Sequence, residues 1–180
     1  MVAKIVGSFP PAGGFSEGGI NTTADALPRS GVAVGGLYTV VDQTTLNWSI
    51  VAYYQAGATV VKGDTLAHDN SQYKTYRMIT AAIATNALQI PRGFAAADVS
   101  NTGYYSFRYI SGYCPTIKFL SNVASNQQCC VSGSIAGAMS AYPGNASLSS
   151  TTTTPLNCVY SLDVNAATAV NSGIIQTFML

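Results

Sequence analysis

The chain has 180 residues, of which 48% are hydrophobic and only 8% are charged, and its net charge is +1. An ordinary globular domain carries about 25% charged residues, so acids and bases for chemistry are scarce and no basic field for nucleic acid is present. No apolar run approaches the roughly 18 residues of a membrane span. We therefore predict no nucleic-acid partner, no membrane segment and a surface suited to contact with other protein surfaces, because interface cores are depleted in charge.

Residues 1–35 are rich in Gly, Pro, Ala and Ser and show no apolar periodicity. We interpret them as an extended N-terminal arm on a single β domain that spans residues 36–180. Two interpretations of the arm stay open: a disordered tail with too little apolar area to offset its ordering entropy, or an arm that orders against a neighbouring subunit. The candidate subunit contacts of the second interpretation are its scattered apolar residues, Phe9, Phe15, Ile20 and Leu27.

The pattern changes to β-strand after the arm. Residues 47–54 alternate, with Trp48 and Ile50 on one face and Ser49 and Val51 on the other. Short β-rich runs around the turn Lys62-Gly63-Asp64 predict further strands. The predicted strands of this part are 37–41, 47–54, 58–61 and 65–67.

Residues 73–88 are ambiguous. The alanines favour a helix, but we favour a strand around residues 76–80, a loop and a second short strand at 87–90. Residues 91–93, Pro-Arg-Gly, stop that strand. A helical turn or a connection is expected at 94–100.

The strongest local pattern predicts a hairpin between residues 104 and 120. Tyr105, Phe107 and Tyr109 share one face of its first strand. A turn is expected at Gly112-Tyr113, before a second strand over 115–120. Aromatic and β-branched cross-strand pairs stabilise such an arrangement.

Short strands separated by turns continue to the end of the sequence, around a Ser/Thr-rich loop at 141–155. We predict strands at 129–131, 135–139, 157–162 and 173–180. Short strands at regular spacing are typical of an all-β fold, here a small β-barrel or β-sandwich.

Catalytic and metal-binding motifs are absent from the sequence. Asp64 and His68 lie close together, but no third residue completes a catalytic set, and the carboxylates are scattered. We therefore predict no enzyme activity, no catalytic residue and no cofactor.

The four cysteines lack the spacing of a zinc site. They are Cys114, Cys129, Cys130 and Cys158. We expect buried free thiols in a reducing cytosol, while one cross-link, Cys114 with Cys158, can still form in an oxidising medium.

The C-terminal half carries a family resemblance. Residues 91–99, Pro-Arg-Gly-Phe-Ala-Ala-Ala-Asp-Val, lead into residues 101–107, Asn-Thr-Gly-Tyr-Tyr-Ser-Phe. These segments and the apolar end of the chain, residues 169–180, resemble the capsid decoration (cement) proteins of tailed bacteriophages. The turn at 62–64 fits the same pattern.

That resemblance implies a small β fold on the exterior of a virion head, often a homotrimer, with an arm that grips the major capsid protein. We therefore expect a structural protein of the virion that is assembled in the host cytoplasm and stabilises the capsid. Two alternatives stay open. One is another virion component, such as a tail or fibre-attachment protein, and the other is a carbohydrate-binding β module that uses exposed tyrosines and Trp48.

Overall fold

The computed structural model is all-β. It describes residues 3–9, 20, 24–42, 45–69, 76–81, 91–121, 123–132, 134–142, 159–165 and 167–176, and of residues 3–9 and 42 the backbone only. The described residues contain no helix. Their strands are Ala3–Phe9 (β1), Leu37–Asp42 (β2), Trp48–Ala56 (β3), Leu66–His68 (β4), Arg77–Thr80 (β5), Phe94–Ala95 (β6), Tyr105–Phe119 (β7), Gln128–Val131 (β8), Met139–Ala141 (β9), Val159–Ser161 (β10) and Ala169–Ile175 (β11).

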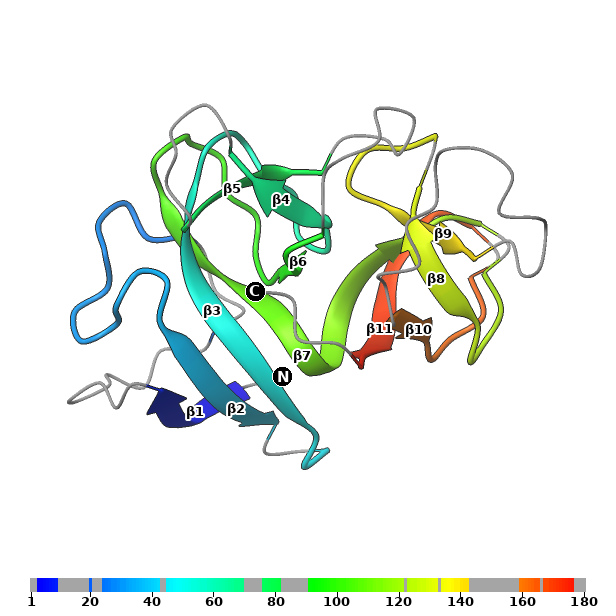
Figure 1. Cartoon of the computed structure of the whole chain (residues 1–180), viewed down its shortest axis with the longest axis horizontal. Helices are drawn as coiled ribbons and strands as arrows, with labels where there is room; N and C mark the ends of the chain where they lie inside the picture. Colours follow the sequence, from blue (N-terminus) through cyan, green and yellow to red (C-terminus); the bar gives the residue numbers. More distant parts are fainter. Residues whose placement is uncertain are drawn as a thin grey trace.

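Five strands close into a barrel at one side of the molecule. The C-terminal half of β7 pairs with β11, and the order continues through β10, β8 and β9. The ring closes where Phe119 of β7 pairs in parallel with Met139 of β9. Figure 1 shows this barrel on the right. The predicted all-β barrel fold is therefore confirmed.

A second, smaller ring lies at the other end of β7. The N-terminal half of β7 pairs with β3 and β6. Strand β3 also pairs with β5, and β5 pairs with β4. An isolated bridge between Thr65 and Phe94 joins the β4 side to β6. The amide of Leu66 donates to the carbonyl of Gly93, and the amide of Ala95 donates to that of Asp64, so backbone hydrogen bonds complete the circuit.

Strand β7 is therefore a wall of both rings, and the predicted hairpin at 104–120 is wrong. The chain runs on through Gly112 and Pro115 as one strand with a sharp bend (Figure 1). Gly112 has a φ of +81°, which a glycine adopts at little cost. Register shifts leave Ile110 as an extra residue opposite β3 and place Pro115 in a bulge opposite β11. A bulge tolerates proline because its amide is not required by the ladder.

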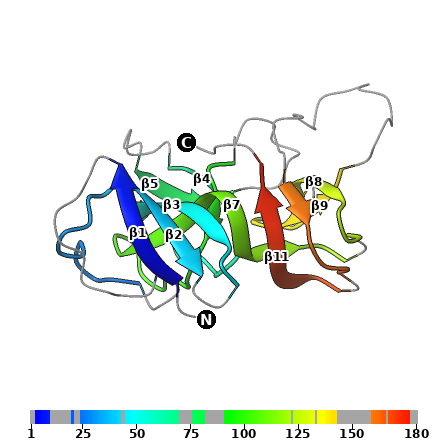
Figure 2. The ribbon, with the colours of Figure 1, turned by 90° about the horizontal axis from the view of Figure 1, so that it is seen from below.

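Two described parts of the segment 1–35, which the sequence predicts to be an arm, pair with this chain's own sheet. Strand β1 pairs with β2 from Ala3↔Asp42 to Phe9↔Leu37. Figure 2 shows β1, β2 and β3 side by side. Asp25 bridges to Tyr105, so this segment is also held by the sheet.

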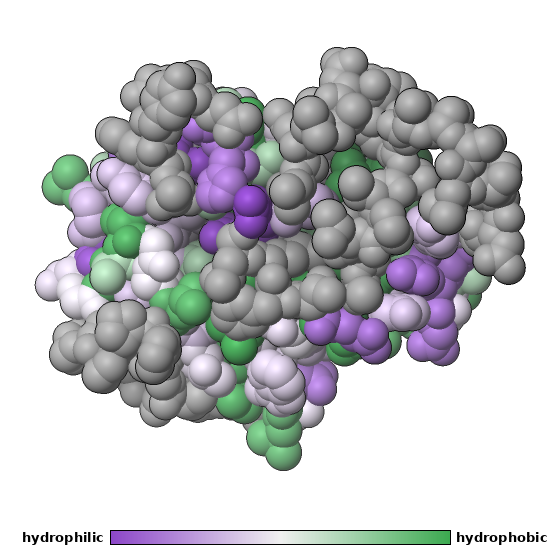
Figure 3. Space-filling view, viewed as in Figure 1, coloured by the Kyte–Doolittle hydropathy of each residue, from purple (hydrophilic) through white to green (hydrophobic). Residues whose placement is uncertain are grey.

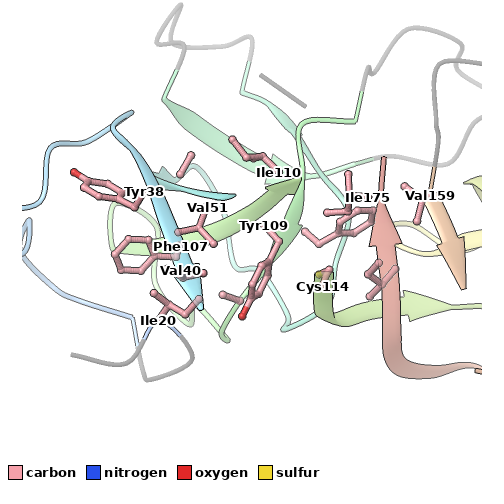
Figure 4. Close-up of a cluster of buried hydrophobic side chains, with 14 of the residues drawn as sticks. Ile20, Tyr38, Val40, Val51, Phe107, Tyr109, Ile110, Cys114, Val159 and Ile175 are labelled. Atoms are coloured by element: carbon pink, nitrogen blue, oxygen red, sulfur yellow. The ribbon is translucent and has the colours of Figure 1, made fainter. Parts of the chain in front are cut away.

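One continuous apolar core connects strands β2 and β3 to the barrel. Tyr38 and Tyr53 pack their rings against Phe107 at ring-centroid distances of 6.0 and 4.8 Å. Each barrel strand adds a buried apolar side chain, namely Ile117, Cys129, Met139, Val159 and Ile175. Figure 4 shows the run from Tyr38 to Val159. A separate cluster fills the smaller ring, with Tyr54, Leu66 and Met78 as its largest side chains.

The remaining strand predictions have mixed outcomes. The favoured strand at 76–80 is confirmed as β5, whereas the strand expected at 87–90 lies outside the described residues. The connection at 94–100 begins instead with the short strand β6. The last strand runs from Ala169 to Ile175, earlier than predicted.

Candidate interaction surface

The four predicted contacts of the arm separate into different environments. Ile20 is 2% exposed and belongs to the core, so it is not available to a partner. Leu27 is 77% exposed. Phe9 pairs with Leu37 through its backbone, and its side chain, like the whole of Phe15, lies outside the described structure.

The segment that carries Leu27 is fixed by polar contacts. Arg29 forms an ion pair with Asp25 at 3.1 Å, and the Tyr53 hydroxyl donates to the same carboxylate at 2.9 Å. The Arg29 guanidinium also lies over the Phe107 ring, 5.5 Å from its centroid. Leu27 therefore extends from a held loop.

The end of the β2–β3 hairpin carries two large exposed apolar side chains, which we call the hairpin anchor: Leu46 in the turn and Trp48 at the start of β3. They are 75% and 55% exposed. The turn projects at the bottom of Figure 1, and apolar atoms cover the matching protrusion in Figure 3. Leu46 has a φ of +57°, a left-handed conformation that is uncommon for a bulky residue. Such strain persists only where the surrounding structure imposes it, and it is found preferentially at functional sites.

The bend of β7 braces the hairpin anchor. A Cβ on Gly112 would lie 2.6 Å from the Trp48 carbonyl oxygen and 3.2 Å from Cε3 of its indole, so the ring lies directly over the glycine. The Ser49 hydroxyl donates to the Tyr113 carbonyl. Trp48 is thus half-exposed but held, and a held aromatic side chain loses little entropy when a partner binds.

A second exposed apolar cluster lies on the connection from β10 to β11, which we call the β10–β11 turn (residues 162–165). Leu162 and Val164 are exposed and flank the exposed Asp163. The Asp163 carboxylate accepts from the Ser172 hydroxyl at 2.7 Å. The buried Asn165 side chain donates to the Asp163 carbonyl at 3.1 Å. This turn is therefore also held in one conformation.

A buried carboxylate joins the two rings. Asp64 is 4% exposed, and its carboxylate accepts from the Thr80 hydroxyl at 2.9 Å and from the Val61 amide at 3.1 Å. The Lys118 ammonium lies 3.2 Å from the other carboxylate oxygen. Lys118 belongs to the barrel half of β7, whereas Thr80 belongs to the smaller ring.

These contacts assign Asp64 a structural role. Its carboxylate contacts Thr80, Lys118 and the Val61 amide and not His68, so the two residues considered as a catalytic pair are not brought together. A Cβ on Gly137 would lie 2.6 Å from the Asp64 Oδ1 atom, so the carboxylate is also enclosed by the loop before β9. The side-chain partners, Thr80 and Lys118, lie 16 and 54 residues from Asp64 in the sequence, which is why the sequence did not reveal them.

The smaller ring has a partly polar lining. Arg108 is buried, and burial, followed by the neighbouring charge of Arg92, lowers the pKa of its guanidinium to about 10. Burial also raises the pKa of the Tyr54 phenol above its ordinary range. Tyr54 therefore stays neutral at physiological pH and is not a ready proton donor.

The described cysteines are free and buried, at positions 114, 129 and 130. Burial raises the pKa of Cys114 to about 12 and that of Cys129 to about 12. At neutral pH both are therefore thiols, and the thiolate is the reactive form. Cys158 lies outside the described residues, so its cross-link with Cys114 stays a prediction without support from the structure.

The buried thiols predict a loss of stability in mild alkali. Between pH 8 and 10 the unfolded chain releases thiol protons that Cys114 and Cys129 retain when folded. The unfolded state then binds fewer protons, and the free energy of unfolding falls by about 1 kcal/mol for each thiol. Urea titrations of the reduced protein at several pH values measure this fall. The Cys114→Ala variant should lose about 1 kcal/mol less over the same interval, and an equal loss in both proteins would contradict the assignment.

Among the described residues no three His, Cys, Asp or Glu side chains gather as a potential metal site. That part of the chain also has no helix with the length and hydropathy required to cross a bilayer. No protein-family model matches the chain, and no curated protein matches it in sequence. The described residues offer exposed apolar side chains on turns that hydrogen bonds hold in place.

Proposed function

We propose that this chain is a non-enzymatic structural protein of a phage virion that binds the assembled capsid and stabilises it. The observation that carries the proposal is a chain with 8% charged residues that exposes large apolar side chains on its turns. Exposed apolar side chains with few charges around them are typical of surfaces that become buried between proteins. The family resemblance of residues 91–107 and 169–180 supplies the capsid as the partner.

The mechanism of stabilisation is mass action. A protein that binds the assembled lattice and not its dissociated subunits stabilises the lattice, and the stabilisation per site grows with the logarithm of its free concentration relative to Kd. Each copy adds buried apolar area across subunit joints, and net charge of +1 lets neighbouring copies lie close without strong repulsion. Of the two predicted contacts whose side chains the structure describes, Leu27 is exposed and is proposed to contact the major capsid protein.

Capsids stripped of this protein should disassemble at a lower temperature than decorated capsids, and adding back the purified chain should restore the difference. Leu27→Asp should weaken co-sedimentation with empty capsids at least about tenfold, because the substitution buries a charge in an apolar contact. Equal heat resistance with and without the chain would refute the proposal. Normal binding by the variant would refute only the role of Leu27.

A carbohydrate-binding module is the second candidate, and the half-exposed Trp48 is the observation that favours it. The tyrosines favour it less, since every tyrosine among the described residues is at least partly buried and four are fully buried: Tyr38, Tyr53, Tyr54 and Tyr109. Binding of the free protein to a glycan array would support this candidate. A tail or fibre-attachment protein differs in location, which particle density distinguishes.

A further inference from the structure

Two arginine side chains lie close together in the smaller ring. Arg108 of β7 is 6% exposed, and it pairs with Ala52 on β3 and with Ala95 on β6, so it stands in the middle of the ring's wall. Arg92 lies just before β6, and its amide donates to the Leu66 carbonyl at 2.7 Å. Burial, and then the neighbouring charge of Arg92, lowers the pKa of the Arg108 guanidinium. Like charges disfavour each other's charged state, and an anion bound beside them would reverse that effect.

Tyr54 adds a buried hydroxyl to the same face. It pairs with Ser106 on β7, two residues from Arg108, so Tyr54 and Arg108 are diagonal neighbours on one face of the sheet. Tyr54 is fully buried, and its hydroxyl has no hydrogen-bond partner among the described residues. Folding therefore removes this group from water without replacing its hydrogen bonds, which is unfavourable. Because burial raises the pKa of the phenol, the hydroxyl keeps its proton and is able to donate it to an acceptor.

The charges around this cluster leave a positive excess at Arg92. The Asp64 carboxylate is near enough to act on Tyr54, but the Lys118 ammonium lies 3.2 Å from that carboxylate and balances its charge. Arg92 forms no ion pair with a described residue, and its Nε atom is buried there without a hydrogen-bond partner. The residue as a whole is only partly buried, so solvent reaches it.

We propose that Arg92, Arg108 and the Tyr54 hydroxyl bind a small tetrahedral oxyanion, a phosphate or sulfate group, in the smaller ring. Guanidinium groups bind such oxyanions through paired, charge-assisted hydrogen bonds. Arg92 is the contact on the solvent side, and Arg108 and Tyr54 are the buried contacts. The anion offsets the repulsion between the two arginines and supplies the acceptor that Tyr54 lacks. The inference concerns a ligand site and does not depend on the proposed function.

Isothermal titration calorimetry of the full chain with inorganic phosphate, in chloride buffer at pH 7 and constant ionic strength, tests the site. One phosphate should bind per chain, and Arg92→Gln should weaken binding at least about tenfold, because a charge-assisted contact is lost. Lys62→Gln is the matched control: it removes one positive charge from a partly buried lysine outside the cluster and should leave binding unchanged. No saturable binding, or equal weakening by both variants, would overturn the proposal.

Tyr54→Phe separates a ligand contact from a structural role. Phenylalanine keeps the ring and removes the hydroxyl that has no partner, so the urea midpoint in chloride should be unchanged or higher. Phosphate should bind at least about threefold more weakly to this variant, because one donor is missing. A lower midpoint together with unchanged phosphate affinity would show that the hydroxyl serves folding, and it would overturn the assignment of Tyr54.

Urea unfolding at increasing phosphate concentration is an independent measurement. A ligand that binds only the folded chain raises the midpoint once its concentration exceeds Kd, but phosphate also stabilises proteins in general. The midpoint should therefore rise more in the unmodified chain than in Arg92→Gln. Equal rises would show a general salt effect only and would overturn the proposal.

Calorimetry with O-phosphoserine distinguishes the sources of the anion. Binding of both compounds would identify a terminal phosphate group as the ligand, and binding of inorganic phosphate alone would identify the free ion; either result supports the site. Co-sedimentation of the same variants with empty capsids is measured in chloride alone. Failure of the anion site and failure of the proposed function therefore give different results.

Discussion

Replacing Gly93 by alanine is expected to lower the free energy of unfolding by at least about 3 kcal/mol. Gly93 has a φ of +125°, and a Cβ built there would lie 2.3 Å from the Tyr109 carbonyl oxygen. Relief requires β6 to move away from β7 at the pair Phe94↔Tyr109. That movement would also disturb the hydrogen bond from the Leu66 amide to the Gly93 carbonyl, which helps to close the smaller ring.

Gly103→Ala is the matched control for this substitution. Gly103 also has a positive φ, +88°, but no atom lies within 4 Å of its would-be Cβ. Only the backbone conformation then opposes the methyl group, and the expected loss is about 1–2 kcal/mol. Urea denaturation of both variants measures the difference in the free energy of unfolding. Equal losses of stability would show that the structure removes the overlap between the introduced methyl group and the Tyr109 carbonyl at no cost.

Removal of the Asp64 carboxylate is expected to cost about 2–4 kcal/mol. In Asp64→Ala the Lys118 ammonium, the Thr80 hydroxyl and the Val61 amide all lose an acceptor. The Lys118 side chain is 26% exposed, so partial access to water keeps the loss below that of a fully buried unpaired charge. Urea denaturation at neutral pH gives the value.

Asp98→Ala controls for the general effect of losing a carboxylate. Asp98 is exposed and accepts from the Lys62 amide at 2.8 Å, so its replacement should cost about 1 kcal/mol or less. Asp64→Asn, which keeps an acceptor oxygen but loses the charge, should fall between the two alanine variants. An Asp64→Ala protein as stable as Asp98→Ala would show that the carboxylate does not hold the rings together.

The all-β class followed from local pattern. The alternating segment 47–54 is rich in β-formers, and it corresponds to β3, Trp48–Ala56. Strand β5 was recoverable because Arg77–Thr80 contains residues that suit a pleated surface. The pattern identified the strands but not their buried faces, since Ser49 is buried, Trp48 is exposed and residues 51–54 are buried on both faces of β3.

The course of β7 was not predictable from the same signals. Glycine and proline mark turns, but they also mark bends and bulges. The choice between them depends on partners, and the two halves of β7 pair with β3 and β11, which are distant from each other in the sequence. Strand β1 was missed because Ala3–Phe9 lies among glycines and prolines that obscure its alternation.

The candidate surface was predictable only in part. Leu27 was predicted as a subunit contact, and its exposure is compatible with that prediction without testing it. Ile20 is likewise an isolated apolar residue in the sequence, but it is buried in the core. The burial of an isolated residue depends on tertiary contacts that a local pattern does not show. The conformation of Leu46 carries no signal in sequence because leucine is the wrong residue for a left-handed turn.

Because one strand is a wall of both rings, the molecule cannot be divided into two autonomous fragments. A cut near Gly112 would leave each half of β7 attached to one ring only, and neither fragment would retain the bend that supports Trp48. If either ring unfolded, β7 would lose hydrogen-bond partners, and the other ring needs β7 as one of its strands. The two rings should therefore unfold in a single cooperative transition.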